Sequence, residues 1–280
     1  MSDDQRRSRV SVSRDHVRVL GSFSLVRDGA TVPLGVDSRR VVAYLAVHPR
    51  PQHRRGLAAD LWPGVPAEAA LRLLDDAVAA LDVPGLLIEA DDTLALAPEA
   101  VVDLAEAMAL VRVLPDLPAD EMVDTVLLRS DILPGWTAAW IVVERERFRQ
   151  LRLHAMEERS LRLSAAERHE DAVAMAEVAV STAPSRESAR RALIKAHLAQ
   201  GNIAAAVAEH DAYQELLRSS VGGPALSGLD GLLPPSPAFP VLQARRAMPR
   251  SAVMLPRLRS VRSGGTRRLV AGGSVPGTAR

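Results

Sequence analysis

The hydrophobic pattern of the chain changes after residue 34, from short apolar runs to longer segments with helical spacing. The short runs, at residues 17–20, 23–25 and 31–34, have the length and composition of strands. Residues 27–30 join the last two runs and contain an Asp-Gly dipeptide, which favours a tight turn. The first part of the chain is therefore predicted to form a small antiparallel sheet.

Three helices are expected to follow this sheet. Residues 41–47 form an apolar segment that Pro49 ends, and residues 54–61 form a second helix, closed by Trp62-Pro63-Gly64. The third helix covers residues 68–81. Its large apolar residues recur at intervals of three and four, which predicts one buried face made of Leu71, Leu74, Val78 and Leu81.

A hairpin and a connecting region come next. Residues 86–88 and 93–96 are strand-like runs joined around Asp91-Asp92, and they predict a small β-hairpin. Residues 98–130 are expected to be mainly helical and to bridge the two halves of the chain. Acidic residues lie opposite the apolar stripe of this region, which consists of Val101, Leu104, Met108 and Val111.

The segment 133–152 introduces the second half of the chain. Pro134-Gly135 marks a sharp turn that begins a long helix, in which Trp136 and Trp140 are one helical turn apart. An apolar stripe continues along the helix through Ile141, Phe148, Leu151 and Ala155. The opposite face is expected to be solvated, with i,i+3 ion pairs between Glu144 and Arg147 and between Glu146 and Arg149.

The remainder of the second half repeats with an offset of 34 residues. Ala-Val-Ala occurs at residues 172–174 and again at residues 206–208, and Pro184 follows the first copy where a tetratricopeptide unit closes its second helix. Small alanines let antiparallel helices approach closely, which favours a stacked array of helix pairs. We expect the helix at residues 136–163 to cap this array with Trp136, Trp140 and Ile141.

Composition limits the class of protein. With 280 residues, of which 48% are hydrophobic, the chain is long enough for about two domains. It contains no cysteine, which excludes disulfides, thiolate-bound zinc and cysteine catalysis. No apolar run approaches the ~20 residues of a membrane helix, and the first residues lack an apolar signal core. We therefore expect a cytoplasmic protein that makes no membrane contact.

Charge is distributed unevenly along the chain. Residues 1–59 contain 11 arginines against five acidic residues, whereas residues 60–130 contain three arginines against 15 acidic residues. After Ser219 there are nine arginines and one aspartate, in a stretch rich in Gly, Pro and Ser that we expect to be disordered. Within this stretch, residues 226–229 and 232–233 are the candidates for local docking.

Motifs for catalysis or cofactor binding are incomplete. The glycine-rich segments 264–266 and 272–274 lack the Gly-Lys-Ser/Thr end of a phosphate-binding loop. His169 begins a pattern similar to that of a zinc protease, but Val173 stands where the second histidine ligand is needed. We therefore expect no enzyme activity, no cofactor and no metal site.

Several short motifs, taken in order, resemble a known family. The first helix ends in His48-Pro49, the second runs into Leu61-Trp62-Pro63, and the second half carries Leu133-Pro134-Gly135-Trp136, then Trp140 and Glu144-Arg145-Glu146-Arg147. Over residues 17–217 the chain is similar to the antibiotic regulatory protein (SARP) family of actinobacterial transcriptional activators. Members join an OmpR-type winged-helix DNA-binding domain to a bacterial transcriptional activator domain, which is helical and tetratricopeptide-like.

The resemblance implies a fold that is mainly α with a small N-terminal β component. A winged helix-turn-helix is expected to precede a tetratricopeptide-like helical repeat domain. The expected parts are a disordered arm (1–15), a winged-helix DNA-binding-like domain (16–97), a helical bacterial transcriptional activator domain (98–218) and a disordered basic tail (219–280).

DNA binding by such a fold requires cationic side chains that face phosphates, normally from the third helix and from the wing. Arg72 is the only cation on the third helix, where the other charged residues are Glu68, Asp75 and Asp76. The wing tip is also acidic, with the sequence Glu89-Ala90-Asp91-Asp92. Backbone amides and arginines at helix starts can bind phosphate together, so the candidate DNA contacts are Arg39, Arg40, Arg54, Arg55 and Arg72.

The implied function is that of a DNA-binding transcriptional activator. Its winged helix would bind promoter DNA, and its helical repeat domain would contact RNA polymerase or form a homodimer. The acidic third helix and wing support a second hypothesis, because a carboxylate that faces the DNA backbone repels it. The protein would then be an interaction module or anti-activator whose winged helix has lost DNA binding.

Overall fold

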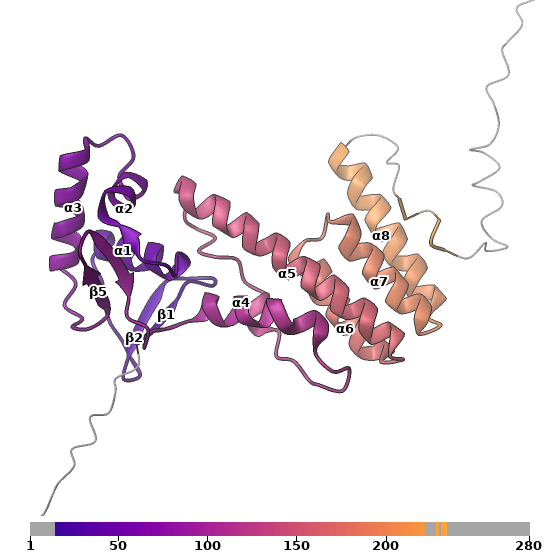
Figure 1. Cartoon of the computed structure of the whole chain (residues 1–280). Helices are drawn as coiled ribbons and strands as arrows, with labels where there is room; N and C mark the ends of the chain where they lie inside the picture. Colours follow the sequence, from indigo (N-terminus) through magenta and orange to yellow (C-terminus); the bar gives the residue numbers. More distant parts are fainter. Residues whose placement is uncertain (1–14, 222–227, 230, 234–280) are drawn as a thin grey trace, which may run out of the picture. The chain divides into compact units, whose positions relative to one another are not determined.

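The N-terminal sheet contains the three antiparallel strands that the sequence predicts. The computed structural model describes residues 15–221, 228–229 and 231–233. In it, β1 (Asp15–Arg18) pairs with β2 (Ser24–Arg27), beside which it lies in Figure 1, and β2 pairs with β3 (Ala30–Thr31). Asp28 and Gly29 have positive φ angles of 52° and 80°, so the predicted tight turn joins β2 to β3. The strands of this sheet are β1 (Asp15–Arg18), β2 (Ser24–Arg27), β3 (Ala30–Thr31) and β7 (Val101–Val102).

The fourth strand of this sheet, β7, differs from the prediction. Val101 lies in β7 and pairs in parallel with β1, whereas the sequence pattern places it on a helix. Two successive β-branched residues suit a pleated strand. The helix α4 (Asp103–Val113) begins directly afterwards. The carboxylate of Asp103 accepts hydrogen bonds from the backbone N–H groups of Val19 and Leu20, at 2.9 and 3.0 Å. The connecting region is therefore attached to the sheet before its helix starts.

Three helices and a second sheet complete a winged helix-turn-helix. The wing is the predicted hairpin, β5 (Leu87–Ala90) with β6 (Thr93–Leu96), and the short β4 (Gln52–His53) pairs with β6. The first helix begins at Val36 instead of residue 41, so Arg39 and Arg40 lie in its first turns. The three helices are α1 (Val36–Val47), α2 (Arg54–Leu61) and α3 (Ala67–Ala79).

The buried face of α3 is rotated relative to the predicted one. Ala70, Leu74 and Ala77 are buried, whereas Leu71 and Val78 are only partly buried. The two alanines allow α3 to approach α1 closely, and the Ser38 hydroxyl of α1 donates to the Ala77 carbonyl oxygen at 2.8 Å. A pattern built on large side chains alone does not detect this face.

The connecting region is helical only in part. After α4 come two short 3₁₀ helices, η1 (Leu114–Asp116) and η2 (Val126–Leu128), and residues 117–125 contain no helix or strand. The guanidinium of Arg159, a buried residue of the second half, donates to the carbonyl oxygens of Leu117 and Pro118. A helix would use these carbonyls for its own hydrogen bonds, so binding by Arg159 favours an irregular backbone.

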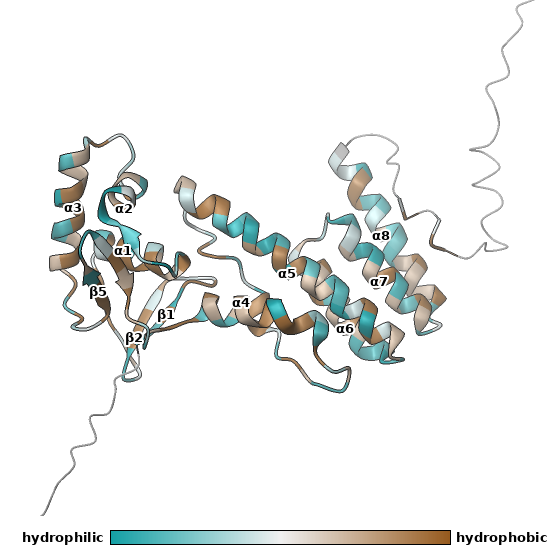
Figure 2. Ribbon diagram, in the orientation of Figure 1, coloured by the Kyte–Doolittle hydropathy of each residue, from teal (hydrophilic) through white to brown (hydrophobic). Residues whose placement is uncertain are grey.

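Four helices form the second half, in two consecutive pairs, and each packs against the next one along the chain (Figure 1). They are α5 (Ala139–Ala165), α6 (His169–Thr182), α7 (Glu187–Ala199) and α8 (Ile203–Val221). Each helix carries hydrophilic and hydrophobic residues (Figure 2). Alanines fill the contacts as expected, and those that are buried include Ala172, Ala176, Ala179, Ala189, Ala192, Ala196 and Ala206. The mainly α fold with a helical repeat is therefore confirmed.

The buried face of α5 is broader than the predicted stripe. Ile141, Phe148 and Ala155 are buried as expected, but Leu151 is 39% exposed. The helix packs against α6 and α7 on one side and against α4 on the other, so residues between the predicted positions also become buried. Those additional buried apolar residues are Leu153, Met156 and Leu163.

Trp136 and Trp140 connect the two halves of the chain instead of capping the helical array. The ring centroid of Trp140 lies 4.9 Å from that of Tyr44 in α1, and the Trp136 centroid lies 6.5 Å from that of Phe23. Burial raises the pKa of Tyr44, as does the hydrogen bond from its hydroxyl to Asp60 at 2.6 Å. Both tryptophans are half-buried, and Trp136 precedes α5.

Ordered structure extends beyond residue 218, where the tail is predicted to begin. The helix α8 continues to Val221, and Leu229 is fully buried in a cluster with Ile194 and Tyr213. Leu232 and Leu233 pack against the same cluster, so local docking is found for these leucines. The predicted arm at residues 1–14 and most of the predicted tail lie outside the described residues.

Candidate nucleic-acid interface

The winged helix holds Arg40 through its own atoms. The Nη2 of Arg40 donates to the Leu61 carbonyl oxygen at 2.9 Å, at the end of α2. Its guanidinium lies 5.8 Å from the centroid of the Trp62 ring, and its Nη1 lies 3.5 Å from the Asp37 carboxylate. Arg40 therefore stabilises the contact between α1 and α2, and these interactions compete with any phosphate contact.

Arg54 is bound by two carboxylates from different elements. It is the first residue of α2, and its Nη2 donates to Asp75 of α3 at 2.6 Å while its Nη1 donates to Glu89 of β5 at 3.0 Å. Burial opposes the charge of Arg54, but the hydrogen bonds and charges of Asp75 and Glu89 outweigh that effect, so its pKa is raised. Sequence reasoning identified Arg54 as a candidate but did not foresee these partners.

The other three candidate arginines are more accessible. Arg55 lies 3.4 Å from Glu68 of α3, with the two side chains 67% and 72% exposed. Arg72 is exposed on α3 and makes no ion pair with any described residue. Arg39 is exposed on α1, where it donates to the Leu34 carbonyl oxygen at 3.3 Å and borders a groove with Trp136. The structure thus groups Arg54, Arg55 and Arg72 around α2 and α3, and places Arg39 beside the connection to α5.

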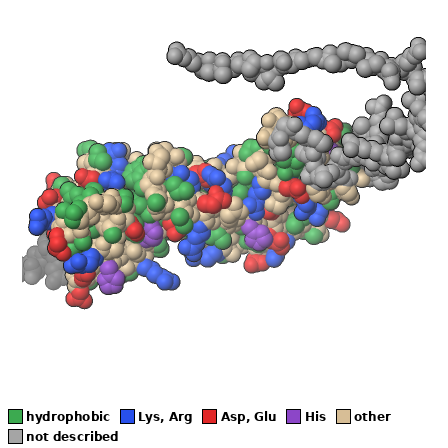
Figure 3. All heavy atoms as spheres, turned by 90° about the horizontal axis from the view of Figure 1, so that it is seen from above, with side chains coloured by type: hydrophobic (Ala, Val, Ile, Leu, Met, Phe, Trp, Pro, Cys, Tyr) green, Lys and Arg blue, Asp and Glu red, His purple; other side chains and the backbone are tan. Residues whose placement is uncertain are grey.

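The outward face of α3 and the wing is mainly acidic. Glu68, Asp75 and Asp76 are exposed on α3 together with Arg72. At the wing tip, Asp91 has a φ of 49°, and both Asp91 and Asp92 are exposed. On the face drawn in Figure 3, basic and acidic side chains lie side by side with no broad area of one sign. Such a surface attracts DNA less than an arginine-rich one does.

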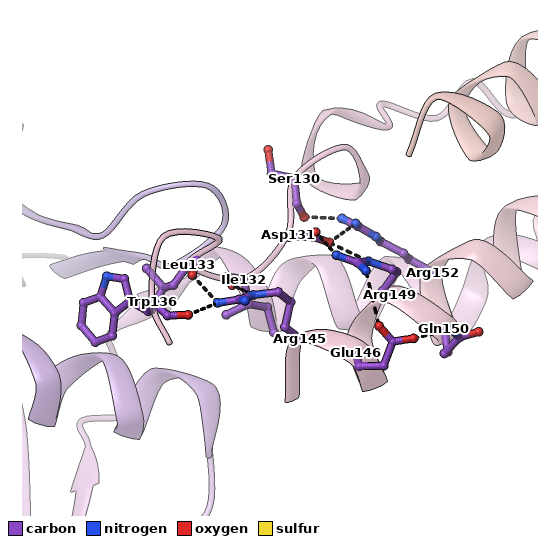
Figure 4. Close-up of polar contacts among 10 residues, drawn as sticks. All are labelled: Ser130, Asp131, Ile132, Leu133, Trp136, Arg145, Glu146, Arg149, Gln150 and Arg152. Atoms are coloured by element: carbon purple, nitrogen blue, oxygen red, sulfur yellow. Dashed lines mark hydrogen bonds and ion pairs between the residues drawn. The ribbon is translucent and has the colours of Figure 1, made fainter. Parts of the chain in front are cut away.

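A second arginine cluster, on α5, was predicted to be part of a solvated face. Arg145 donates to the carbonyl oxygens of Ile132, Leu133 and Trp136, with distances of 2.7 Å to Ile132 and 2.8 Å to Trp136 (Figure 4). The expected i,i+3 pairs do form, with 3.7 Å between Glu144 and Arg147 and 3.4 Å between Glu146 and Arg149. The same face, however, also binds the linker formed by residues 130–138.

Asp131 is the anionic centre of this linker contact. Its carboxylate accepts hydrogen bonds from both Arg149 and Arg152, and Arg152 also donates to the Ser130 carbonyl oxygen (Figure 4). The hydrogen bond to Asp131 raises the pKa of Arg149, whereas burial lowers the pKa of Arg152. The i,i+4 and i,i+3 spacing of Arg145, Arg149 and Arg152 places them on one side of α5, which was the available signal in the sequence.

The linker also extends the N-terminal sheet. The backbone N–H of Gly21 donates to the Asp131 carbonyl oxygen at 2.8 Å, and the N–H of Leu133 donates to the Val19 carbonyl oxygen at 2.9 Å. The α5 arginines therefore hold a segment that is itself hydrogen-bonded to the winged-helix half. This arrangement couples the two halves of the chain through backbone atoms as well as through the aromatic contacts.

The described residues contain neither a metal site nor a membrane span. No group of three or more His, Asp or Glu side chains among them is arranged to hold a metal ion. No helix in the described part of the chain is both long and apolar enough to cross a bilayer.

A family model matches the second half of the chain. Residues 125–232 match the family model of the bacterial transcriptional activator domain, a range that includes the linker and α5 to α8. The second half of the chain therefore contains this domain. Together with the winged helix that precedes it, the match agrees with the resemblance to the SARP-type transcriptional regulators.

A solved structure has the same fold. Mycobacterium tuberculosis EmbR, determined in complex with a low affinity phosphopeptide, is 21% identical and superimposes with a TM-score of 0.57. The match covers 86% of this chain and 67% of the EmbR chain. No curated protein sequence matches the chain significantly.

Proposed function

We propose that the protein is a DNA-binding transcriptional activator. Its winged helix binds promoter DNA, and its helical domain contacts RNA polymerase or a second copy of the chain. The observation that carries this proposal is the attachment of a winged helix to a bacterial transcriptional activator domain through a linker that both halves bind.

Arg39, Arg55 and Arg72 are the proposed phosphate contacts. Exposed ion pairs contribute only about 0–1 kcal/mol, so Arg55 can exchange Glu68 for a phosphate at little cost. Arg72 occupies the outward face of α3, which is the helix that enters the major groove in this type of fold. Arg40 is assigned to the stability of the domain instead, because it is held by Leu61, Trp62 and Asp37.

Replacing Arg39, Arg55 and Arg72 together with alanine is expected to weaken binding to a promoter fragment from upstream of the gene. Each phosphate contact contributes about 0.9 to the slope of log affinity against log salt, so the slope should fall by about 2 to 3. The affinity is measured by fluorescence anisotropy over a series of salt concentrations. The matched control replaces Arg112, Arg147 and Arg218, three exposed arginines outside the winged helix, and should leave most of the slope intact.

Equal slopes for the two triple variants would show that DNA is bound elsewhere on the protein. Thermal unfolding of each variant provides the control for folding. Since all six arginines are exposed or only weakly paired, none of these substitutions should remove a buried contact.

A second function is favoured by the acidic surface of α3 and the wing. Under this hypothesis the winged helix has lost DNA binding, and the protein acts as an anti-activator that associates with a related activator through its helical domain. The supporting observation is that Arg54, the least exposed of the arginines around α2 and α3, is already paired with two carboxylates, those of Asp75 and Glu89. A folded protein that binds no duplex DNA at low salt would favour this function over the first.

A further inference from the structure

Arg54, Asp75 and Glu89, here called the Arg54 cluster, lie where the second helix, the third helix and the wing meet. Arg54 begins α2, Asp75 is on α3 and Glu89 is on β5 of the wing. Separate terminal nitrogens of the guanidinium bind the two carboxylates, at 2.6 Å for Asp75 and 3.0 Å for Glu89. A single arginine therefore connects the second helix, the third helix and the wing.

Exposure differs sharply between the arginine and its partners. The Arg54 side chain is 18% exposed, whereas those of Asp75 and Glu89 are 60% and 56% exposed. The cluster has one positive and two negative groups, so it presents net negative charge to an approaching DNA backbone. A guanidinium binds carboxylate and phosphate oxygens with the same fork of N–H donors. The two carboxylates thus occupy donors that a phosphate would otherwise use.

We propose that Asp75 and Glu89 act as an internal substitute for DNA phosphate and hold Arg54 out of the DNA interface. A phosphate must displace both carboxylates to reach Arg54, so in the natural sequence Arg54 adds no phosphate contact and the winged helix binds DNA less tightly than it would with Arg54 released. This inference rests on the proposed DNA-binding function and specifies how that site is restrained. A merely structural role, in which Arg54 only ties the three elements together, predicts no gain of DNA binding when the carboxylates are neutralised.

The test uses the full chain and a labelled duplex of random sequence, because phosphate contacts do not depend on base sequence. The variant Asp75→Asn with Glu89→Gln keeps the size and polarity of both side chains but releases Arg54. We expect affinity to rise about tenfold and the salt slope to increase by about 1, as for one added phosphate contact. Adding Arg54→Gln to this variant should cancel the increase in slope, while Arg54→Gln in the natural sequence should leave the slope unchanged.

The matched control removes the same charge elsewhere in the winged-helix half. Asp82→Asn with Glu99→Gln neutralises two exposed acidic residues that form no ion pair with any described residue. This control should change affinity by less than about twofold, because the carboxylates that pair with Arg54 are those of Asp75 and Glu89, so Arg54 stays bound in the control. Melting curves establish that each variant is folded. Glu89→Gln alone, which keeps the Asp75 contact, is the substitute if the double variant unfolds, and it should show a smaller gain in the same direction.

Two results would overturn the inference. The first is an unchanged affinity in a folded Asp75→Asn, Glu89→Gln variant. The second is a gain that persists in full after Arg54→Gln, since the carboxylates would then act by repulsion alone. The same experiment separates failure of this inference from failure of the proposed function. If the natural protein binds promoter DNA but the variant shows no gain, only the inference is refuted. Natural protein that binds no DNA, together with an Arg54-dependent gain in the variant, supports the inference and refutes ordinary promoter binding.

Discussion

Asp131→Asn is expected to lower the free energy of unfolding by about 3–5 kcal/mol, the typical result of removing one partner from a buried ion pair. Arg152 is 1% exposed, and Asp131 is the one carboxylate that pairs with it among the described residues. Asparagine would leave the buried guanidinium charge without a counter-charge. The midpoint and slope of urea unfolding measure this change.

Glu146→Gln is the matched control for Asp131→Asn. Glu146 pairs with Arg149, which Asp131 also binds, but its side chain is 53% exposed. Exposed pairs contribute about 0–1 kcal/mol, so this variant should unfold almost like the natural protein. If the two variants were equally stable, the linker would not be held by a buried ion pair on α5.

Phe148→Ala is also expected to lower the free energy of unfolding by about 3–5 kcal/mol, because it removes a large buried ring. Phe148 is 2% exposed, and its ring centroid lies 5.1 Å from the guanidinium carbon of Arg152. Truncation therefore leaves a cavity and also removes the cation–π contact of Arg152, the residue that pairs with Asp131. Calorimetry or urea unfolding would quantify the loss.

Leu151→Ala distinguishes the observed face of α5 from the face that the sequence predicts. Both Phe148 and Leu151 belong to the predicted apolar stripe, but Leu151 is 39% exposed. Its truncation should cost less than about 1 kcal/mol, in the range of surface substitutions and partial burial. A loss for Leu151→Ala as large as that for Phe148→Ala would place the helix in the predicted orientation and contradict the structure.

The elements of the winged helix could be predicted because turns and helix ends have strong local signals. The Asp-Gly turn after β2, the helix stop before Pro49 and the Trp62-Pro63-Gly64 break all depend on residues close in sequence. The strand β7 could not be found in this way, because two β-branched residues are a weak local signal and the strand is completed by pairing with β1, which is far away in the sequence.

The sequence predicts which residue types form the candidate site, but it does not predict which of these residues contact each other. The sequence identifies Arg54 at a helix start and Asp75 and Glu89 as acidic residues, yet their contact depends on how α2, α3 and the wing pack. The α5 arginines illustrate the same point. Their regular spacing is visible in the sequence, but an exposed charged face and a face that binds backbone carbonyls have the same pattern.

The most direct test of the proposed function is the affinity of the 280-residue chain for its upstream promoter fragment, compared with a random duplex of equal length. Both are titrated from low to physiological salt. Our account predicts measurable binding to both at low salt, a decrease for both as salt rises, and tighter binding to the promoter at every concentration. Absence of binding to either duplex at low salt, by protein whose melting curve shows it to be folded, would contradict the account.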